Sequence, residues 1–233
     1  MSDAQIIAGV SREYPQLRVE ASLWCHSAAK RAFDLFCAAP VVVAALPVML
    51  VIGVVVKLTS AGPVLFRHRR VGINGREFFL LKFRTMTHQR GGTGPAVTRA
   101  GDPRVTSAGR LLRKWKLDEL PQLINVVRGD MSLVGPRPDA AEYLNALPLE
   151  YRRVLRLRPG ITGAATIQLR HEEELLAAVP AEQLQEFYVT TLLPRKVQLD
   201  LEYATRASFL TDVALLFRTF AAIAAPASSH HPG

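Results

Sequence analysis

The feature that most constrains this chain is a run without any charged side chain over residues 35–56, LFCAAPVVVAALPVMLVIGVVV. A run of this length and apolarity is long enough to cross the hydrocarbon core of a bilayer. Pro47 lies near its middle, where it removes a backbone donor and clashes with the carbonyl group of Val43. A helix over residues 30–58 is therefore expected to bend near Pro47.

The charges around this run indicate on which side of a membrane its ends lie. Lys30 and Arg31 precede it, and Lys57, Arg67, Arg69 and Arg70 follow it. Because cytoplasmic flanks carry the excess of Lys and Arg, both ends are predicted on the cytoplasmic side. The helix would then be re-entrant, with Lys30, Arg31 and Pro47 as its membrane-contacting residues. A tilted single span and a buried core helix are the alternatives that the apolar pattern leaves open.

The rest of the chain is strongly basic, with 29 Lys and Arg residues against 20 Asp and Glu residues and a formal charge of +9. Such a surface favours phosphate-bearing partners, namely nucleic acid, anionic lipid or a nucleotide substrate. Cys25 and Cys37 have no metal-type spacing and are expected to be reduced thiols. Residues 1–29 lack the basic start and cleavage site of a signal peptide and are predicted to form a polar, partly helical extension.

Residues 64–71 and 77–84 alternate in polarity around Ile73-Asn74-Gly75. Asn-Gly between two such runs is a strong short-range signal for a β-hairpin. The second strand carries Lys82 and Arg84, which are two residues apart and so lie on the same side of it. Residues 87–100 are polar and Gly-rich and are predicted to form a mobile loop, with an active-site lid as the alternative.

Two adjacent carboxylates, Asp118 and Glu119, lie within a run of basic residues. Pro121 suits a first helical turn, so Asp118 is predicted as the N-cap of a helix that ends at Gly129. The apolar stripe of this helix would consist of Leu120, Leu123, Ile124 and Val127. The positive field at the helix N-terminus is expected to keep Asp118 ionised.

Adjacent side chains point in different directions, so Asp118 could attack a substrate while Glu119 holds a cation. The alternative is an ordinary N-cap Asp beside a solvated Glu. Arg137 lies between Pro136 and Pro138, whose rings stiffen the backbone. Its guanidinium is therefore expected to be pre-aimed and to bind a phosphate through two parallel hydrogen bonds.

The C-terminal half is predicted to be helical over residues 140–157, with a tight connection over residues 158–163. The acidic run after His171 is predicted to be a solvated first turn of a helix and not a metal site. Residues 208–225 form an amphipathic pattern, and this helix could pack on the core or lie in the membrane interface. Its shared apolar face consists of Leu210, Val213, Phe217, Phe220 and Ala221. The residues from 226 onward are expected to be disordered.

These motifs, in this order, resemble the small monotopic phosphoglycosyl transferases, a family of bacterial sugar transferases. The resemblance covers residues 30–219, nearly the whole chain. The motifs that carry it are Lys30-Arg31 with Asp34, Gly62-Pro63-Val64, Lys82-Phe83-Arg84-Thr85-Met86, Asp102-Pro103-Arg104, and the segments 117–123, 131–138 and 158–163. The pattern Lys196, Asp200, Tyr203, Ser208, Asp212, Thr219 also fits.

The resemblance implies a polyprenyl-phosphate hexose-1-phosphate transferase that uses a UDP-sugar, releases UMP and starts the assembly of a glycoconjugate or exopolysaccharide. Asp118 matches the nucleophile, which forms a sugar-phosphoryl-aspartate, and Glu119 matches the ligand of a Mg²⁺ cofactor. The expected substrate-binding residues are Lys82, Arg84, Arg104, Arg113, Arg137 and Asp200. The expected partners are the UDP-sugar, undecaprenyl phosphate and the cytoplasmic face of the inner membrane, with room for a homo-oligomer and no nucleic acid.

The implied fold is a mainly helical α+β arrangement: a re-entrant membrane helix, a cytosolic catalytic domain with one β-hairpin, and interfacial amphipathic helices. The expected boundaries are an extension over 1–29, the membrane helix over 30–58, the catalytic domain over 59–207, and the C-terminal helix and tail over 208–233. The chain is expected to be the catalytic unit alone, without the four-helix N-terminal domain of larger relatives.

Three positions depart from the family pattern. Leu46 stands before Pro47 where Ser is common, His68 stands where Gln is usual, and Ala164 follows Gly163 where an aromatic residue is frequent. None of them touches the implied chemistry, and no motif encodes which sugar is transferred. The competing hypothesis is a non-catalytic, membrane-anchored basic protein that binds anionic lipid or nucleic acid. It explains the charge and the apolar run but gives the paired carboxylates and Arg137 no role.

Overall fold

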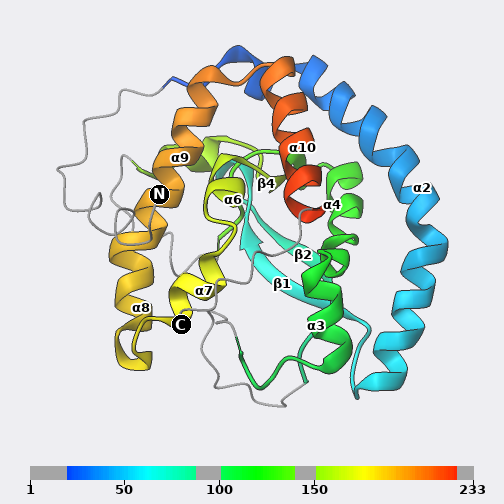
Figure 1. Cartoon of the computed structure of the whole chain (residues 1–233). Coiled ribbons are helices and arrows are strands. Elements are labelled where there is room, and N and C mark those ends of the chain that lie inside the picture. The colour runs from blue at the N-terminus through cyan, green and yellow to red at the C-terminus, as the bar shows by residue number, and fades with distance from the viewer. Residues whose placement is uncertain (1–19, 88–100, 140–150, 225–233) are drawn as a thin grey trace.

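The computed structural model describes residues 20–87, 101–139 and 151–224, and it is mainly helical, as predicted. Figure 1 shows the long helix α2 along one side of the molecule, the helix α9 along the opposite side, and a β-hairpin between them. The start of the N-terminal extension, nearly all of the 87–100 loop, the first part of the predicted 140–157 helix and the C-terminal tail lie outside the described residues.

Helix α2 spans Ala28–Thr59 and follows a short 3₁₀ turn, η2, at Leu23–His26. Its N-cap is Ser27, whose hydroxyl accepts the Lys30 N–H at 3.0 Å. The helix stays continuous through Pro40 and Pro47, and Figure 1 shows its axis curving around the molecule. Only 11% of its most apolar window is buried, so the buried-core-helix alternative is wrong. Its apolar side chains are exposed instead, among them Phe36, Val43, Leu46, Leu50, Val51 and Leu58.

Helix α2 contacts the rest of the protein near both of its ends. Ala38 and Asp34 are buried toward the N-terminal end, and Ile52 and Val56 are buried toward the C-terminal end. At the first end, the guanidinium of Arg31 donates to the carbonyl oxygens of Val126 and Val127, at 2.7 and 3.0 Å. Those carbonyls close the helix α4, Gln122–Arg128. Both ends of the apolar helix are thus attached to the same globular body.

The β-hairpin is confirmed, with β1 at Leu65–Val71 and β2 at Glu77–Phe83. The strands pair antiparallel, from Leu65 opposite Phe83 to Val71 opposite Glu77. The connection η3, Ile73–Gly75, places Asn74 at φ 57° and Gly75 at φ 75°. This left-handed backbone is the reason that Asn-Gly is favoured in such a connection.

A second, two-stranded sheet was not predicted. It pairs β3, Ser132–Val134, in parallel with β4, Gly160–Thr162. Strands of three residues carry too little alternation to be recognised in the sequence. The chain packs tightly here, because a Cβ atom added to Gly163 would lie 2.2 Å from the carbonyl oxygen of Gly135. The sheet therefore fixes the start of the segment that carries Arg137.

The remaining elements surround these sheets. They are α3 (Ser107–Lys114), η4 (Leu117–Glu119), η5 (Tyr151–Arg156), α6 (Ala164–Gln168), α7 (Glu172–Ala177), η6 (Ala181–Gln183), α8 (Leu184–Phe187), the π-helical turn η7 (Tyr188–Leu192), α9 (Leu193–Arg206) and α10 (Phe209–Ala224). The described part of the helix predicted over residues 140–157 is thus η5, a 3₁₀ helix with the tighter turn of that type.

Helix α10 turns its apolar face outward. Leu210, Phe217 and Phe220 are between 69% and 75% exposed, whereas Asp212 is buried. The alternative in which this face packs on the core is therefore wrong for these three side chains. Asp212 instead accepts three hydrogen bonds, from Lys30 Nζ at 2.6 Å, Tyr203 Oη at 2.6 Å and Trp24 Nε1 at 2.8 Å.

Lys30 and Arg31, which were predicted to contact the membrane, form bonds within the protein. Lys30 is 5% exposed and pairs with Asp212, and Arg31 closes the end of α4. The sequence pattern missed this because a basic pair beside an apolar run has the same composition in either role. Pro47, the third predicted membrane residue, is exposed on α2.

Asn125 provides a test of how the hairpin is held on α4. Its Oδ1 accepts the N–H of Leu81 at 3.1 Å, and its Nδ2 donates to the Phe79 carbonyl at 2.9 Å. Asn125→Leu leaves these buried backbone groups unpaired, so we expect a loss of about 2–4 kcal/mol in the free energy of unfolding. Arg128→Ala, an exposed position on the same helix, is the control and should change it by about 0.5 kcal/mol or less. Denaturation of the detergent-solubilised protein measures both, and equal stability of the two variants would contradict this role of Asn125.

Candidate active site

The paired carboxylates lie in a short 3₁₀ turn and not at a helix cap. Lys116 adopts the left-handed conformation, with φ 54°, and turns the chain into η4. Helix α4 then begins at Gln122 with Pro121 in the N-cap position and no side-chain cap, so the predicted N-cap role of Asp118 is wrong. Its end at Gly129 is confirmed, because Gly129 has φ 94° and its N–H bonds the carbonyls of Asn125 and Val126.

The predicted stripe of α4 is correct only in part. Leu123 is buried, but Val127 is 39% exposed, and Val126 is buried in its place. The buried face of the helix is shifted relative to the prediction and includes Gln122 and Asn125 as well. The η4 turn before it, with both carboxylates, contacts β2 of the hairpin.

Asp118 is a buried carboxylate, 6% exposed. Its Oδ1 has no hydrogen-bond partner among the described residues. Burial raises the pKa of Asp118 above its ordinary value and Glu119 adds to the rise, while Lys82, Lys116 and Arg113 oppose it. The expectation that a helix N-terminus keeps this group ionised is therefore not what the geometry provides. An unpaired, buried carboxylate is a high-energy group that a ligand or a reaction partner can stabilise.

Glu119 has the opposite environment. Its Oε1 accepts hydrogen bonds from Lys82 Nζ at 2.9 Å and from Arg137 Nη2 at 3.1 Å. Burial alone would raise the pKa of Glu119, but Lys82 and Arg137 outweigh it and hold the pKa far below its usual range. The alternative of a solvated Glu is therefore wrong, since the side chain is only 11% exposed. Glu119 is a carboxylate at every physiological pH.

Arg113 completes the cluster of cations around the pair. Its Nε donates to Thr85 Oγ1 at 3.0 Å, and its Nη1 lies 3.5 Å from Glu173 Oε1. Its charge also lowers the pKa of Asp118. The structure thus brings together five of the predicted site residues, which come from β2, α3, η4 and the segment after β3: Lys82, Arg113, Asp118, Glu119 and Arg137.

Arg84 and Arg104 have other partners. The guanidinium of Arg84 is buried and donates to the carbonyls of Val56, Ser60 and Pro63 at the end of α2. Arg104 forms an ion pair of 2.6 Å with Asp102 in its own turn. Arg84 was predicted to bind substrate. Carbonyl oxygens at a helix end accept hydrogen bonds from a guanidinium as a phosphate does, and the sequence does not distinguish the two.

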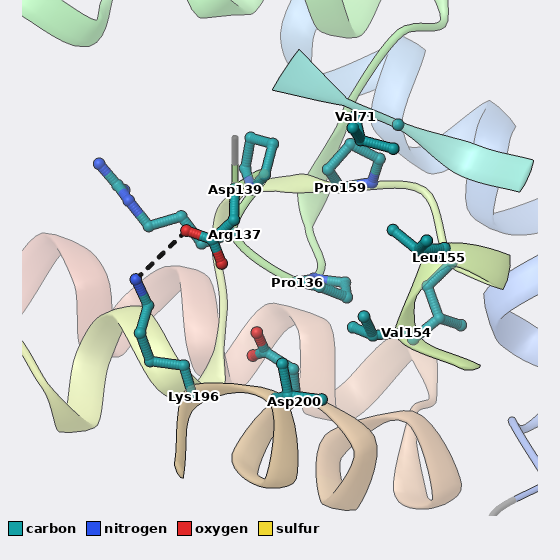
Figure 2. A pocket seen from close by; sticks show the side chains of 13 residues that line it. Val71, Pro136, Arg137, Asp139, Val154, Leu155, Pro159, Lys196 and Asp200 are labelled. Atoms are coloured by element: carbon teal, nitrogen blue, oxygen red, sulfur yellow. Dashed lines mark ion pairs between the residues drawn. The ribbon is translucent and has the colours of Figure 1, made fainter. Parts of the chain in front are cut away.

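Asp200 lies behind the cluster and not within it. It is 3% exposed on α9, and its Oδ1 accepts the N–H of Ala165 at 3.2 Å. Figure 2 shows Lys196 and Asp200 reaching from α9 toward the segment that carries Arg137 and Asp139. Asp139, Tyr188 and Glu172 were not predicted as site residues, yet all three contact Lys196. No signal in the sequence points to Asp139 and Tyr188, because their contacts join distant segments.

The acidic turn of α7 is also closer to the site than predicted. Glu172 lies 3.5 Å from Lys196, and Glu173 pairs with Arg113, so two of these carboxylates are not merely solvated. Within the described residues, no group of three His, Cys, Asp or Glu side chains could hold a metal. Mg²⁺ needs only one or two carboxylates when substrate phosphates supply further oxygens, and the ionised carboxylate of Glu119 fits that requirement.

Comparison with known proteins identifies the family of the chain. A family model described as "Bacterial sugar transferase" matches residues 25–226, so the chain belongs to this family. A UDP-glucose:undecaprenyl-phosphate glucose-1-phosphate transferase of Caulobacter vibrioides is 39% identical over 194 residues, which cover 82% of this chain and 67% of the relative. The exopolysaccharide production protein ExoY of Sinorhizobium fredii is 36% identical over 209 residues, 83% of this chain and 84% of the relative.

Other relatives are much longer than this chain. The match to a UDP-N-acetylgalactosamine-undecaprenyl-phosphate N-acetylgalactosaminephosphotransferase of Aeromonas hydrophila has 35% identity over 199 residues, 83% of this chain but only 43% of the relative. The match to an undecaprenyl-phosphate glucose phosphotransferase of Komagataeibacter xylinus covers only 35% of that relative's length, about a third of it.

The different surroundings of Arg84 and Lys82 give opposite expectations for their variants. Arg84→Lys loses the fork that bonds several carbonyls at once, so we expect a loss of about 1–3 kcal/mol in the free energy of unfolding. The KM for a UDP-sugar in the folded protein should stay unchanged. Lys82→Met leaves Glu119 with Arg137 alone, so kcat/KM should fall on the order of 100-fold. Denaturation and UMP-release kinetics separate the two. A higher KM with unchanged stability in Arg84→Lys would return Arg84 to the substrate site.

Proposed function

We propose that this chain transfers a sugar 1-phosphate from a UDP-sugar to a polyprenol phosphate, with Asp118 as the nucleophile. The observation that carries the proposal is the contrast within one turn: Asp118 is buried without a partner for Oδ1, while Glu119 beside it is neutralised by Lys82 and Arg137. The names of the relatives, which refer to undecaprenyl-phosphate sugar transfer, support it. Family membership also favours the transferase over the non-catalytic binding protein.

The reaction has two half-reactions at one phosphorus atom. An oxygen of Asp118 attacks the β-phosphorus of the UDP-sugar, the bond from that phosphorus to the bridging oxygen breaks, and UMP leaves with the bonding electrons. The phosphate of the polyprenol then attacks the same phosphorus and releases the Asp118 carboxylate, which yields a polyprenyl-diphosphate sugar. Phosphoryl transfer depends mainly on positioning and charge stabilisation, and the cations at Lys82, Arg113 and Arg137 are placed to provide both.

Glu119 is the residue proposed to hold Mg²⁺. Among the described residues, Lys82 and Arg137 both pair with Oε1 of Glu119, and no ion pair involves Oε2. Glu119 would hold the Mg²⁺, which would neutralise part of the charge of the diphosphate. Lys82 and Arg137 keep Glu119 ionised, so the ligand needs no deprotonation before it binds the ion.

The identity of the sugar stays open. Two relatives of similar identity to this chain are named for different sugars, one for glucose and the other for N-acetylgalactosamine. A panel of UDP-sugars, scored by UMP release, would identify the donor.

The proposed location is the cytoplasmic face of the bacterial inner membrane, with α2 re-entrant. Two observations support this topology. Arg31 and Arg84 attach opposite ends of α2 to one globular body, and a helix that crossed the bilayer would place its ends on opposite sides of it. The exposed apolar side chains of α2 and α10 would then lie in the same leaflet.

Asp118→Asn tests the nucleophile. The amide does not form a stable acyl phosphate, so UMP release should fall by about 1,000-fold or more. Wild-type protein incubated with a UDP-sugar and Mg²⁺, without acceptor, should gain the mass of one sugar phosphate, and Asp118→Asn should gain none. Omission of Mg²⁺ should suppress both signals. Glu202→Gln, an exposed position on α9, is the matched control and should behave as wild type. A normal rate in Asp118→Asn would refute the mechanism.

Two single-cysteine proteins test the topology. In a background with Cys25→Ser and Cys37→Ser, Ala28→Cys and Thr59→Cys place thiols at the exposed ends of α2. An impermeant thiol reagent added to intact cells should label neither, because both ends lie in the cytosol, and inverted vesicles should label both. Labelling of one variant alone from outside would mean that α2 crosses the membrane.

A further inference from the structure

The guanidinium of Arg137 reaches Glu119 only if the segment Pro136–Asp139 is held in place. Pro136 and Pro138 restrict the neighbouring backbone but do not attach it to the body of the protein. The attachment comes from α9. The Oδ1 of Asp200 accepts the backbone N–H of Ala165 at 3.2 Å, and the backbone N–H of Arg137 lowers the pKa of the same carboxylate.

A second attachment holds the end of this segment. Lys196 lies one helical turn before Asp200, and its Nζ is 3.5 Å from Asp139 Oδ1. Tyr188 donates its hydroxyl to the same carboxylate oxygen at 3.0 Å and lies 3.1 Å from Lys196 Nζ. Lys196 is also 3.5 Å from Glu172. The segment is thus held at Arg137 by one residue of α9 and at Asp139 by another.

The position of Asp200 excludes direct contact with a substrate at Glu119. Asp200 and Lys196 are 3% and 4% exposed. Figure 2 shows the side chain of Arg137 extending away from Asp200, with the backbone of the segment between them. Burial raises the pKa of Asp200 to about 7, although the backbone N–H groups and the charge of Lys196 lower it. Keeping this buried carboxylate ionised therefore has an energetic cost. Such a cost is typical of groups that serve a function.

We propose that Asp200 and Lys196 are positioning residues, which hold the Pro136–Asp139 segment so that Arg137 stays on Glu119, and which touch neither the UDP-sugar nor a metal. The proposal rests on the proposed function, and it replaces the expectation that Asp200 binds substrate. Its consequence is that Asp200 has an effect on the reaction only while Arg137 is present.

A double-mutant cycle measures this dependence. The kcat/KM for UMP release is determined for wild type, Asp200→Asn, Arg137→Ala and the double variant. Asp200→Asn keeps the shape but removes the negative charge and replaces one of the two accepting oxygens with a donor, so we expect a fall of about 10- to 100-fold. In the Arg137→Ala background the same change should cost about 2-fold or less. If the losses in kcat/KM of the two single variants multiply in the double variant, the proposal is wrong.

Tyr188→Phe and Asp212→Asn complete the experiment. Tyr188→Phe removes only the hydroxyl that bonds Asp139. It should lower kcat/KM less than Asp200→Asn does, and this loss should also vanish in the Arg137→Ala background. Asp212→Asn is the matched control: it changes a buried Asp on α10 whose partners are Lys30, Tyr203 and Trp24. It should lower the melting temperature, and its effect on kcat/KM should multiply with that of Arg137→Ala.

Hydrogen exchange separates failure of this proposal from failure of the proposed function. The amides of Gly135, Arg137 and Asp139 should exchange faster in Asp200→Asn than in wild type, and at the wild-type rate in Asp212→Asn. This readout needs no activity. Absence of UMP release from wild type would refute the function alone, whereas unchanged exchange in Asp200→Asn would refute the positioning role.

Discussion

The arrangement of the whole molecule depends on the Glu119 carboxylate and its two cations. Lys82 comes from the hairpin, Glu119 from the turn before α4, and Arg137 from the segment after β3, yet all three meet within 3.1 Å. A buried charge is tolerated only while its partners are in place, so the loss of any one element leaves the others with an uncompensated charge. The β3–β4 pairing and the contacts of α9 therefore matter because they deliver Arg137, and Asn125 matters because it holds the hairpin that delivers Lys82.

The same chemistry, a guanidinium on carbonyl oxygens, joins the apolar helix to this body. Arg31 bonds the last carbonyls of α4, and Arg84 bonds carbonyls at the end of α2, where intrahelical partners are lacking. Two cations that a basic, membrane-associated sequence suggests for phosphates are thus used to close helix ends. Lys30 also has a partner within the protein, because it forms an ion pair with Asp212 between α2 and α10. The strong positive charge of the chain therefore overstates how many cations face a ligand.

The sequence was sufficient for features with local causes. Asn74-Gly75 predicted the hairpin, Gly129 predicted the end of α4, and the uncharged run predicted an exposed apolar helix. It was insufficient where tertiary contacts decide. The cap at Asp118 failed because packing of the turn against the hairpin, and not the N-cap preference of Asp, sets where α4 begins. The parallel β3–β4 pair joins residues far apart in the chain, and the Lys196–Asp139–Tyr188 contacts join three segments, so no local pattern could reveal either.

The division between the two adjacent carboxylates follows from where the cations lie. If Lys82 and Arg137 were shared equally, both acids would be stable ion pairs and neither would gain from a ligand. Instead both cations bond Glu119, whose pKa falls, while the pKa of Asp118 rises because it is buried without a comparable partner. Neutralising one of two buried carboxylates also reduces the negative charge that would repel a diphosphate. The arrangement thus leaves one carboxylate stable and suited to a cation, and keeps the other poised for the phosphorus atom of the proposed donor.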